Sequence, residues 1–178
     1  ALGAWAVLAL AALAMWLPQM LKKSESRPLA RPGAALRRVL RAPRAWQIAL
    51  FMGLQSLTFY VVLAWLPDLL QSRGLGAAEA GWMLALSQAT GILGSATVPV
   101  WAGRRADQRR IVGWLVGAEA VALAGLTLPG AGMTALWVGL LGAVLGGTFG
   151  LSLLFLVLRA PEAETATALS GMAQSVGY

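Results

Sequence analysis

The sequence predicts an all-α integral membrane protein, and three observations support that fold class. Hydrophobic residues make up 58% of the 178 positions and charged residues only 12%, whereas about a quarter of the residues in a soluble domain are charged. Uncharged stretches recur at the length that crosses a bilayer. The net charge of +7 comes from basic residues that gather in alternate connections between these stretches.

The expected helices are uncharged runs of about 20 residues, the length that crosses a hydrocarbon core of about 30 Å. The long apolar stretch in the second half divides at residues 129–132, because Pro129 lacks a backbone donor and the glycines after it favour a turn. We therefore expect a helical bundle of five full transmembrane helices plus a truncated sixth: residues 1–20, 45–67, 80–103, 111–128, 133–158 and 165–178.

The basic residues predict the orientation of these helices. Thirteen of the fourteen lie in the first, third and fifth connections, and eight of those are in residues 21–44. Because cytoplasmic connections are rich in Lys and Arg, these three connections should face the cytoplasm. Seven of the eight tryptophans stand near an expected helix end, where indoles favour the membrane interface.

The composition also excludes several kinds of site. The chain has no Cys and no His, so it lacks a thiol nucleophile, a thiolate metal site and the usual catalytic base. The glycine-rich segment 146–150 lacks the lysine of a phosphate-binding loop. Positive charge confined to short connections is typical of a protein in a lipid bilayer rather than one that binds nucleic acid. We expect no cofactor, no metal, no nucleic-acid partner and no catalytic residue.

Small residues four positions apart predict where helices pack closely. Lipid supplies no hydrophobic drive between helices, so their association depends on close backbone approach. Such rows occur in four expected helices: Gly142, Gly146 and Gly150, beside Gly139, Ala143 and Gly147; Ser87, Gly91 and Ser95; Gly113 and Gly117; Thr167, Gly171 and Ser175.

The connection 103–110, Gly-Arg-Arg-Ala-Asp-Gln-Arg-Arg, resembles the signature of the major facilitator superfamily between its eighth and ninth helices. The resemblance implies a cytoplasmic gate at Gly103, Asp107 and Arg110, in which the glycine lets helices cross closely. The aspartate would cap the following helix, whose N-terminus favours negative charge. Gln108 replaces the arginine of the signature and Arg110 stands where glycine is expected, so an ordinary positively charged loop is the alternative.

Two further stretches, residues 46–67 and 169–178, resemble the seventh helix and the start of the eleventh in one branch of that superfamily, the cyanate permease and nitroimidazole transporter family. The resemblance implies a major-facilitator-type helical bundle in the inner (plasma) membrane of a bacterium.

The same resemblance implies the domain organisation. Residues 1–20 would end the sixth helix of the family fold, residues 21–44 would form a basic cytoplasmic linker, and residues 45–178 would form the C-terminal bundle of helices seven to eleven. The missing N-terminal half of the same chain would be its partner. The implied function is secondary active transport of a small organic or anionic solute by alternating access. A non-transporting membrane scaffold and an intramembrane enzyme are the alternatives.

Polar residues inside membrane helices are costly and are therefore candidates for function. At about 100° per residue, Gln55, Ser56 and Tyr60 share one arc of their helix, with Phe59 between them. The resemblance implies that this helix faces the central cavity. We expect Gln55, Phe59 and Tyr60 to bind a small-molecule solute. The alternative is that these groups bond neighbouring helices.

Gln88 and Gln174 are further substrate-binding candidates, the second because the resemblance places it on a cavity-facing helix. We expect the hydroxyls of Ser87, Thr90 and Ser152 to bond their own helix backbone instead, as hydroxyls commonly do.

Glu119 is the ninth residue of the expected helix 111–128 and so stands near the middle of the membrane. An ionised carboxylate there costs roughly 2.5–3.5 kcal/mol, so we expect it to be protonated or paired. A carboxylate that couples transport to protons is the functional hypothesis. The resemblance makes this the ninth helix, a peripheral support, which favours a structural role.

Overall fold

The structure, a computed structural model, describes scattered positions between 7 and 18 and residues 32–105, 107–128, 133–158 and 163–177. The chain forms two compact units, residues 1–31 and residues 32–178, which we describe separately. The described positions of the first unit are helical. Most of the crossing expected at residues 1–20 lies outside the described residues.

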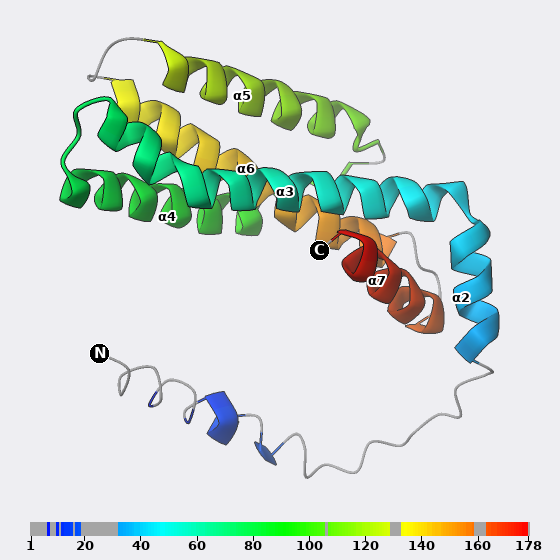
Figure 1. Cartoon of the computed structure of the whole chain (residues 1–178). Helices are drawn as coiled ribbons and strands as arrows, with labels where there is room; N and C mark the ends of the chain where they lie inside the picture. The colour runs from blue at the N-terminus through cyan, green and yellow to red at the C-terminus, as the bar shows by residue number, and fades with distance from the viewer. Residues whose placement is uncertain are drawn as a thin grey trace. The chain divides into compact units, whose positions relative to one another are not determined.

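All the elements described in the second unit are helices, which confirms the predicted fold class. They are α2 (Pro32–Arg41), α3 (Pro43–Ser72), α4 (Ala77–Gly103), α5 (Arg109–Thr127), α6 (Thr134–Leu158) and α7 (Ala163–Gly177). Among the described residues, α3, α4, α5 and α6 are long and apolar enough to cross a membrane, and α7 has 15 residues. Figure 1 shows the four long helices side by side, with α2 and α7 at the end of the bundle where α3 begins.

The proline in α3 does not end the helix. We expected the crossing to stop at Pro67, but α3 continues to Ser72 with Pro67 inside it. Proline removes one helical hydrogen bond, a loss that membrane helices tolerate where neighbouring groups satisfy the freed carbonyl. The chain turns instead at Gly74, whose φ of 92° is a conformation that glycine reaches without steric cost.

Helix α2 occupies part of the segment that we expected to form the basic cytoplasmic linker. Pro32 stands at its first position, where the fixed φ of proline suits a helix. Val39 is buried in an apolar cluster with residues of α3 and α7. The indole Nε1 of Trp46 donates to the carbonyl oxygen of Leu40 at 3.0 Å across the bend between α2 and α3. The sequence signal that we missed is the spacing of Leu36, Val39 and Leu40 on one helical face.

Small residues bring α4 and α6 into backbone contact, which confirms the packing expected from their rows. A Cβ added to Gly146 would overlap the carbonyl oxygen of Gly91. The rows meet residue by residue: Gly142 faces Ser87, Gly146 faces Gly91, and Gly150 faces Ser95. Helices α3, α4 and α5 all pack against α6, which is therefore the central helix of the bundle.

The glycines of the rows predicted on α5 and α7 do not make such contacts. No described atom outside the local helix lies within 4 Å of a Cβ added to Gly113, Gly117 or Gly171. The close packing expected at these rows is therefore wrong for the part of the chain that the structure describes. A row of small residues permits close approach, but close packing also requires that another helix lies against that face.

Large apolar side chains cover the outside of the bundle. Trp65, Trp82 and Trp114 are 68%, 76% and 77% exposed, and many leucines and valines are exposed beside them. A soluble monomer rarely exposes continuous apolar surface of this extent, whereas lipid-facing helices carry it. The surface therefore agrees with a multi-pass membrane protein.

Candidate functional site

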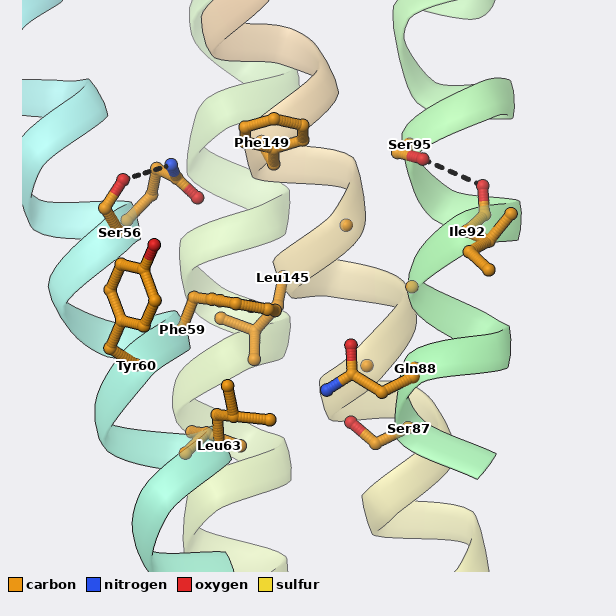
Figure 2. A pocket seen from close by; sticks show the side chains of 15 residues that line it. Ser56, Phe59, Tyr60, Leu63, Ser87, Gln88, Ile92, Ser95, Leu145 and Phe149 are labelled. Carbon is orange, nitrogen blue, oxygen red and sulfur yellow. Dashed lines mark hydrogen bonds between the residues drawn. The ribbon is translucent and has the colours of Figure 1, made fainter. Parts of the chain in front are cut away.

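A cavity of about 330 Å³ lies between α3, α4 and α6 and brings together four of the five residues predicted to bind substrate. Gln55 lines it from α3. Figure 2 shows Phe59 and Tyr60 of α3 and Gln88 of α4 around the same cavity. Ser56 also lines it, so the polar arc expected on α3 faces the cavity. Helical periodicity predicted the shared arc on α3, and the fold brings Gln88 of α4 to the same cavity.

Helix α3 supplies an amide and an aromatic pair to the cavity wall. Gln55 and Ser56 are 7% and 3% exposed, and Gln55 Nε2 donates to Ser56 Oγ at 2.8 Å. Because that bond uses one amide hydrogen, the amide oxygen of Gln55 and its second N–H stay available. The rings of Phe59 and Tyr60 meet edge to face with centroids 5.5 Å apart, an arrangement that aromatic pairs favour.

Helix α4 supplies the polar group on the opposite wall. The amide of Gln88 points away from its own helix into the cavity (Figure 2), and it makes no hydrogen bond with a described residue. An amide in this position offers two donors and one acceptor oxygen. Gln88 is therefore able to bond a solute without first giving up a protein partner.

The hydroxyls on these helices divide into two groups. Thr90 and Ser152 bond carbonyl oxygens of their own helices, as expected. Ser87 lines the cavity at 4% exposure, and its hydroxyl makes no bond to its own helix in the described structure. The expectation for Ser87 was therefore wrong, and its hydroxyl belongs to the cavity surface.

Helix α6 forms the remaining wall. Gly142 and Gly146 have no side chains and so leave the cavity open beside α4, while Leu145 and Phe149 add apolar surface (Figure 2). Sequence reasoning missed Phe149, although it stands three residues after Gly146 and hence on the same helical face. Phe149 lies among the glycines of α6, which we had interpreted only as residues that allow close packing.

The cavity carries no charged side chain among the described residues that line it. Binding there would rest on amide and hydroxyl dipoles and on aromatic faces. Such a site suits a small polar solute that is neutral or carries a delocalised charge. A compact ion would need a counter-charge that the described residues lining the cavity do not supply.

Gln174 lies apart from this cavity. It is exposed on α7, and its Nε2 donates to Ser170 Oγ at 3.2 Å, one turn earlier on the same helix. Helix α7 packs against α3 and α2, and none of its described residues lines the cavity. The structure therefore does not bring Gln174 together with the other candidates.

The residues of the expected gate lie at the end of α4 and around the start of α5. Asp107 Oδ1 accepts a hydrogen bond from the backbone N–H of Arg109, the first residue of α5, at 3.0 Å, which agrees with the expected capping. A Cβ on Gly103 would meet nothing within 4 Å among the described residues, so the close crossing expected there is not found. Arg110 is exposed on the first turn of α5.

Gln108, which stands in place of the signature arginine, has a role that sequence reasoning missed. It is 8% exposed, and its Nε2 donates to the carbonyl oxygens of Ala102 and Arg105. The Ala102 carbonyl also accepts the backbone N–H of Arg105, so the amide adds to a bond that is already made. Through these two carbonyls the neutral amide ties the end of α4 to the start of α5.

Glu119 lies on α5 and is not part of the cavity lining. Its side chain is partly buried near the middle of that helix. The structure therefore does not bring Glu119 together with the residues predicted to bind substrate.

A second cavity, of about 440 Å³, lies between α3, α5 and α6 and is lined mainly by apolar residues, with Asp68 and Ser72 among the few polar ones. It contains none of the predicted site residues. No three His, Cys, Asp or Glu side chains of the described ranges gather in a way that could hold a metal ion.

A sequence profile of the Major Facilitator Superfamily matches residues 1–178 of this chain. The chain is 39% identical over 170 residues to the 2-nitroimidazole transporter of Escherichia coli (strain K12), which covers 95% of this chain and 43% of the relative. It is 37% identical over 175 residues to the uncharacterized transporter YycB of Bacillus subtilis (strain 168), covering 98% and 43%. It is 28% identical over 141 residues to the cyanate transport protein CynX of Escherichia coli (strain K12), covering 79% and 36%.

The chain therefore spans less than half the length of the curated relatives that it matches. No solved structure matches it.

Proposed function

Because this chain belongs to the Major Facilitator Superfamily, we propose that it is the C-terminal half of a secondary active transporter that moves a small organic or anionic solute by alternating access. The resemblance noted in the sequence is confirmed by the matched relatives, which are transporters. The observation that supports a solute site in this half is the convergence of Gln55, Phe59, Tyr60 and Gln88 on one cavity.

The chemistry of the cavity favours a flat or linear polar solute. Two amides on opposite walls would bond its edges, and the ring of Phe59 or Tyr60 would cover an apolar or π face. Two relatives are named for solutes of this kind, 2-nitroimidazole and cyanate. Both carry hydrogen-bond acceptors and delocalised electrons. We therefore propose a small, planar or linear, acceptor-rich solute for this chain.

The rest of the carrier would complete the path. We propose that residues 1–20 end the sixth helix, residues 21–44 link the halves on the cytoplasmic side, and residues 45–178 form the C-terminal bundle, in a bacterial inner membrane. Gly103, Asp107 and Arg110 would lie at the cytoplasmic gate, and Gln174 would face the other half of the carrier. The backbone contact between α4 and α6 would move these helices as one body when the cavity changes sides.

Uptake by the full-length protein in proteoliposomes tests this proposal, with 2-nitroimidazole and cyanate as probes. We expect Gln55→Ala and Gln88→Ala each to raise the KM about two- to tenfold, because each removes one hydrogen bond of about 0.5–1.5 kcal/mol. Gln71→Ala, at an exposed position on the same helix as Gln55, is the matched control and should leave the KM unchanged.

Unchanged KM values in both cavity variants, at normal expression, would remove this cavity from the solute path. If the wild-type protein moved neither probe nor any other small solute in a screen, the non-transporting scaffold would be favoured. A chemically altered solute recovered from the vesicles would favour the enzyme.

A further inference from the structure

We propose that Ser87 and Gln88 form a subsite on α4 that binds an acceptor oxygen of the solute, and that Ser87 makes the carrier select solutes with such an oxygen. This subsite deepens the proposed function and rests on it for its role in transport. A nitro group or the oxygen end of a linear anion is the kind of group that it would hold.

The hydroxyl of Ser87 differs from the other hydroxyls of its helix. Helix α4 carries three more, on Thr90, Ser95 and Thr97, and each donates to a carbonyl oxygen three or four residues earlier. Ser87 makes no hydrogen bond with a described residue. Because helical hydroxyls commonly bond their own backbone, the exception at Ser87 indicates a partner from outside the helix.

Ser87 is also buried where it lines the cavity, at 4% exposure. No fully enclosed side-chain nitrogen or oxygen of the described residues lacks a hydrogen-bond partner. The unbonded oxygen of Ser87 is therefore not sealed inside the protein, and its open surface faces the cavity. Burying a polar group without a partner is costly, so this hydroxyl is placed to bond a molecule that enters the cavity.

The amide of Gln88 lies beside this hydroxyl. Figure 2 shows the Ser87 oxygen and the Gln88 amide on the same side of α4, both directed into the cavity. A hydroxyl has one hydrogen to donate and an amide has two, so the pair presents several donors to one end of a solute. The described lining carries no charge, and such neutral donors suit an oxygen that is neutral or shares a delocalised charge.

The other serines of the cavity already have protein partners. On α3, Ser56 Oγ accepts from Gln55 Nε2 at 2.8 Å. On α4, Ser95 Oγ donates to the carbonyl oxygen of Ile92 at 2.9 Å (Figure 2). Ser87 is the serine of the described lining without a protein hydrogen bond. A solute therefore gains a bond at Ser87 without breaking one.

The backbone that carries Ser87 is held against α6. The carbonyl oxygen of Ser87 accepts from Thr90 Oγ1 at 3.1 Å, and a Cβ added to Gly142 would overlap the same oxygen. This turn of α4 thus lies directly on the α6 backbone, which limits its movement. A group that is held in place before binding loses little freedom when the ligand arrives. A solute without an acceptor would leave the hydroxyl unpaired, and sites of this kind reject such solutes.

Equilibrium binding to the full-length protein in nanodiscs tests the subsite, with 2-nitroimidazole and 2-trifluoromethylimidazole as probes. Their substituents are similar in bulk, but fluorine bound to carbon is a much poorer acceptor than a nitro oxygen. We expect the wild-type protein to prefer the nitro probe. Ser87→Ala should reduce that preference about two- to tenfold, the contribution of one hydrogen bond. Its thermal unfolding midpoint should not fall, because the hydroxyl that it removes has no protein partner.

Ser152→Ala is the matched control. Ser152 is a buried serine of α6 that lies outside the cavity lining, and its hydroxyl donates to the carbonyl oxygen of Phe149 at 2.6 Å. This variant should keep the wild-type preference between the probes. Should Ser87→Ala not fold, Ser87→Cys decides, since its weak S–H donor should lower the preference in the same direction.

The outcomes separate this proposal from the proposed function. An equal loss of affinity for both probes in Ser87→Ala, or a preference equal to that of the wild type, overturns the role of Ser87. A wild-type protein that does not distinguish the probes overturns the subsite. In either case, uptake of 2-nitroimidazole by wild-type proteoliposomes leaves the transport function standing. Selective binding that depends on Ser87, in a protein that transports neither probe, supports the subsite and overturns the proposed function.

Discussion

Two polar side chains bond the backbone at the connection between α4 and α5. The superfamily signature places an arginine where this chain has Gln108, and the sequence suggested only that the gate was altered. The buried amide instead donates to the carbonyl oxygens of Ala102 and Arg105. Asp107 meanwhile accepts from the first N–H of α5. Asp107 satisfies an N–H that the start of a helix leaves without a partner, and Gln108 bonds the backbone around the end of α4.

At the residue scale we therefore expect Gln108→Ala to destabilise the protein. The substitution removes the bonds to two carbonyls at a nearly buried position, and a neutral hydrogen bond contributes about 0.5–1.5 kcal/mol. Thermal unfolding in detergent should give a lower midpoint than for the wild-type protein. Gln71→Ala removes an exposed amide and is the control. Equal midpoints for the two variants would contradict the role of Gln108.

Helix pairing is decided by which small residues face another backbone. Rows of glycine and serine occur on α4, α5, α6 and α7, but only those of α4 and α6 meet each other. There the helices approach so closely that no Cβ fits between Gly146 and Gly91. Close approach of this kind drives helix association in lipid. Because Gly142 and Gly146 have no side chains, they also leave space for the cavity beside α3.

At the element scale we expect Gly146→Ala to separate α4 from α6. The added methyl overlaps a backbone oxygen, which cannot rotate away as a side chain would, and overpacking of this kind costs about 1–3 kcal/mol. Lower yield of folded protein and a lower unfolding midpoint should result. Gly117→Ala is the matched control, since nothing described lies near its Cβ. A Gly146→Ala protein as stable as the control would show that the contact is dispensable.

The whole molecule is organised by the distribution of its positive charge. Thirteen of fourteen basic residues stand in alternate connections, and the long helices that they separate have apolar outer surfaces. Cytoplasmic loops carry such an excess. The chain should therefore cross the membrane with the α4–α5 connection inside and the α3–α4 connection outside.

Single cysteines test this orientation, because the chain has no native Cys. In a full-length protein without other cysteines, Ala78→Cys, in the first turn of α4, should react with an impermeant maleimide from outside intact cells. Arg104→Cys, after the last turn of α4, should react only after the cells are opened. Labelling of Arg104→Cys in intact cells would reverse the topology. Labelling of both positions in intact cells would contradict a single orientation.

The sequence by itself determined the fold class, the four described crossings to within a few residues, and the arc of α3 that carries Gln55, Phe59 and Tyr60. These properties depend on bilayer thickness and on helical period, which act along one chain segment at a time. The crossing predicted to stop at residue 67, where the uncharged run ends, continues to Ser72, because a helix can extend past the first charged residue that follows an apolar run.

Only the tertiary structure decided which helix faces meet. It joined Gln88 to the arc on α3, left Gln174 outside the cavity, and gave α6 rather than α5 or α7 a close backbone partner. Periodicity fixes what shares a face of one helix, whereas contacts between helices depend on shape and close approach in three dimensions.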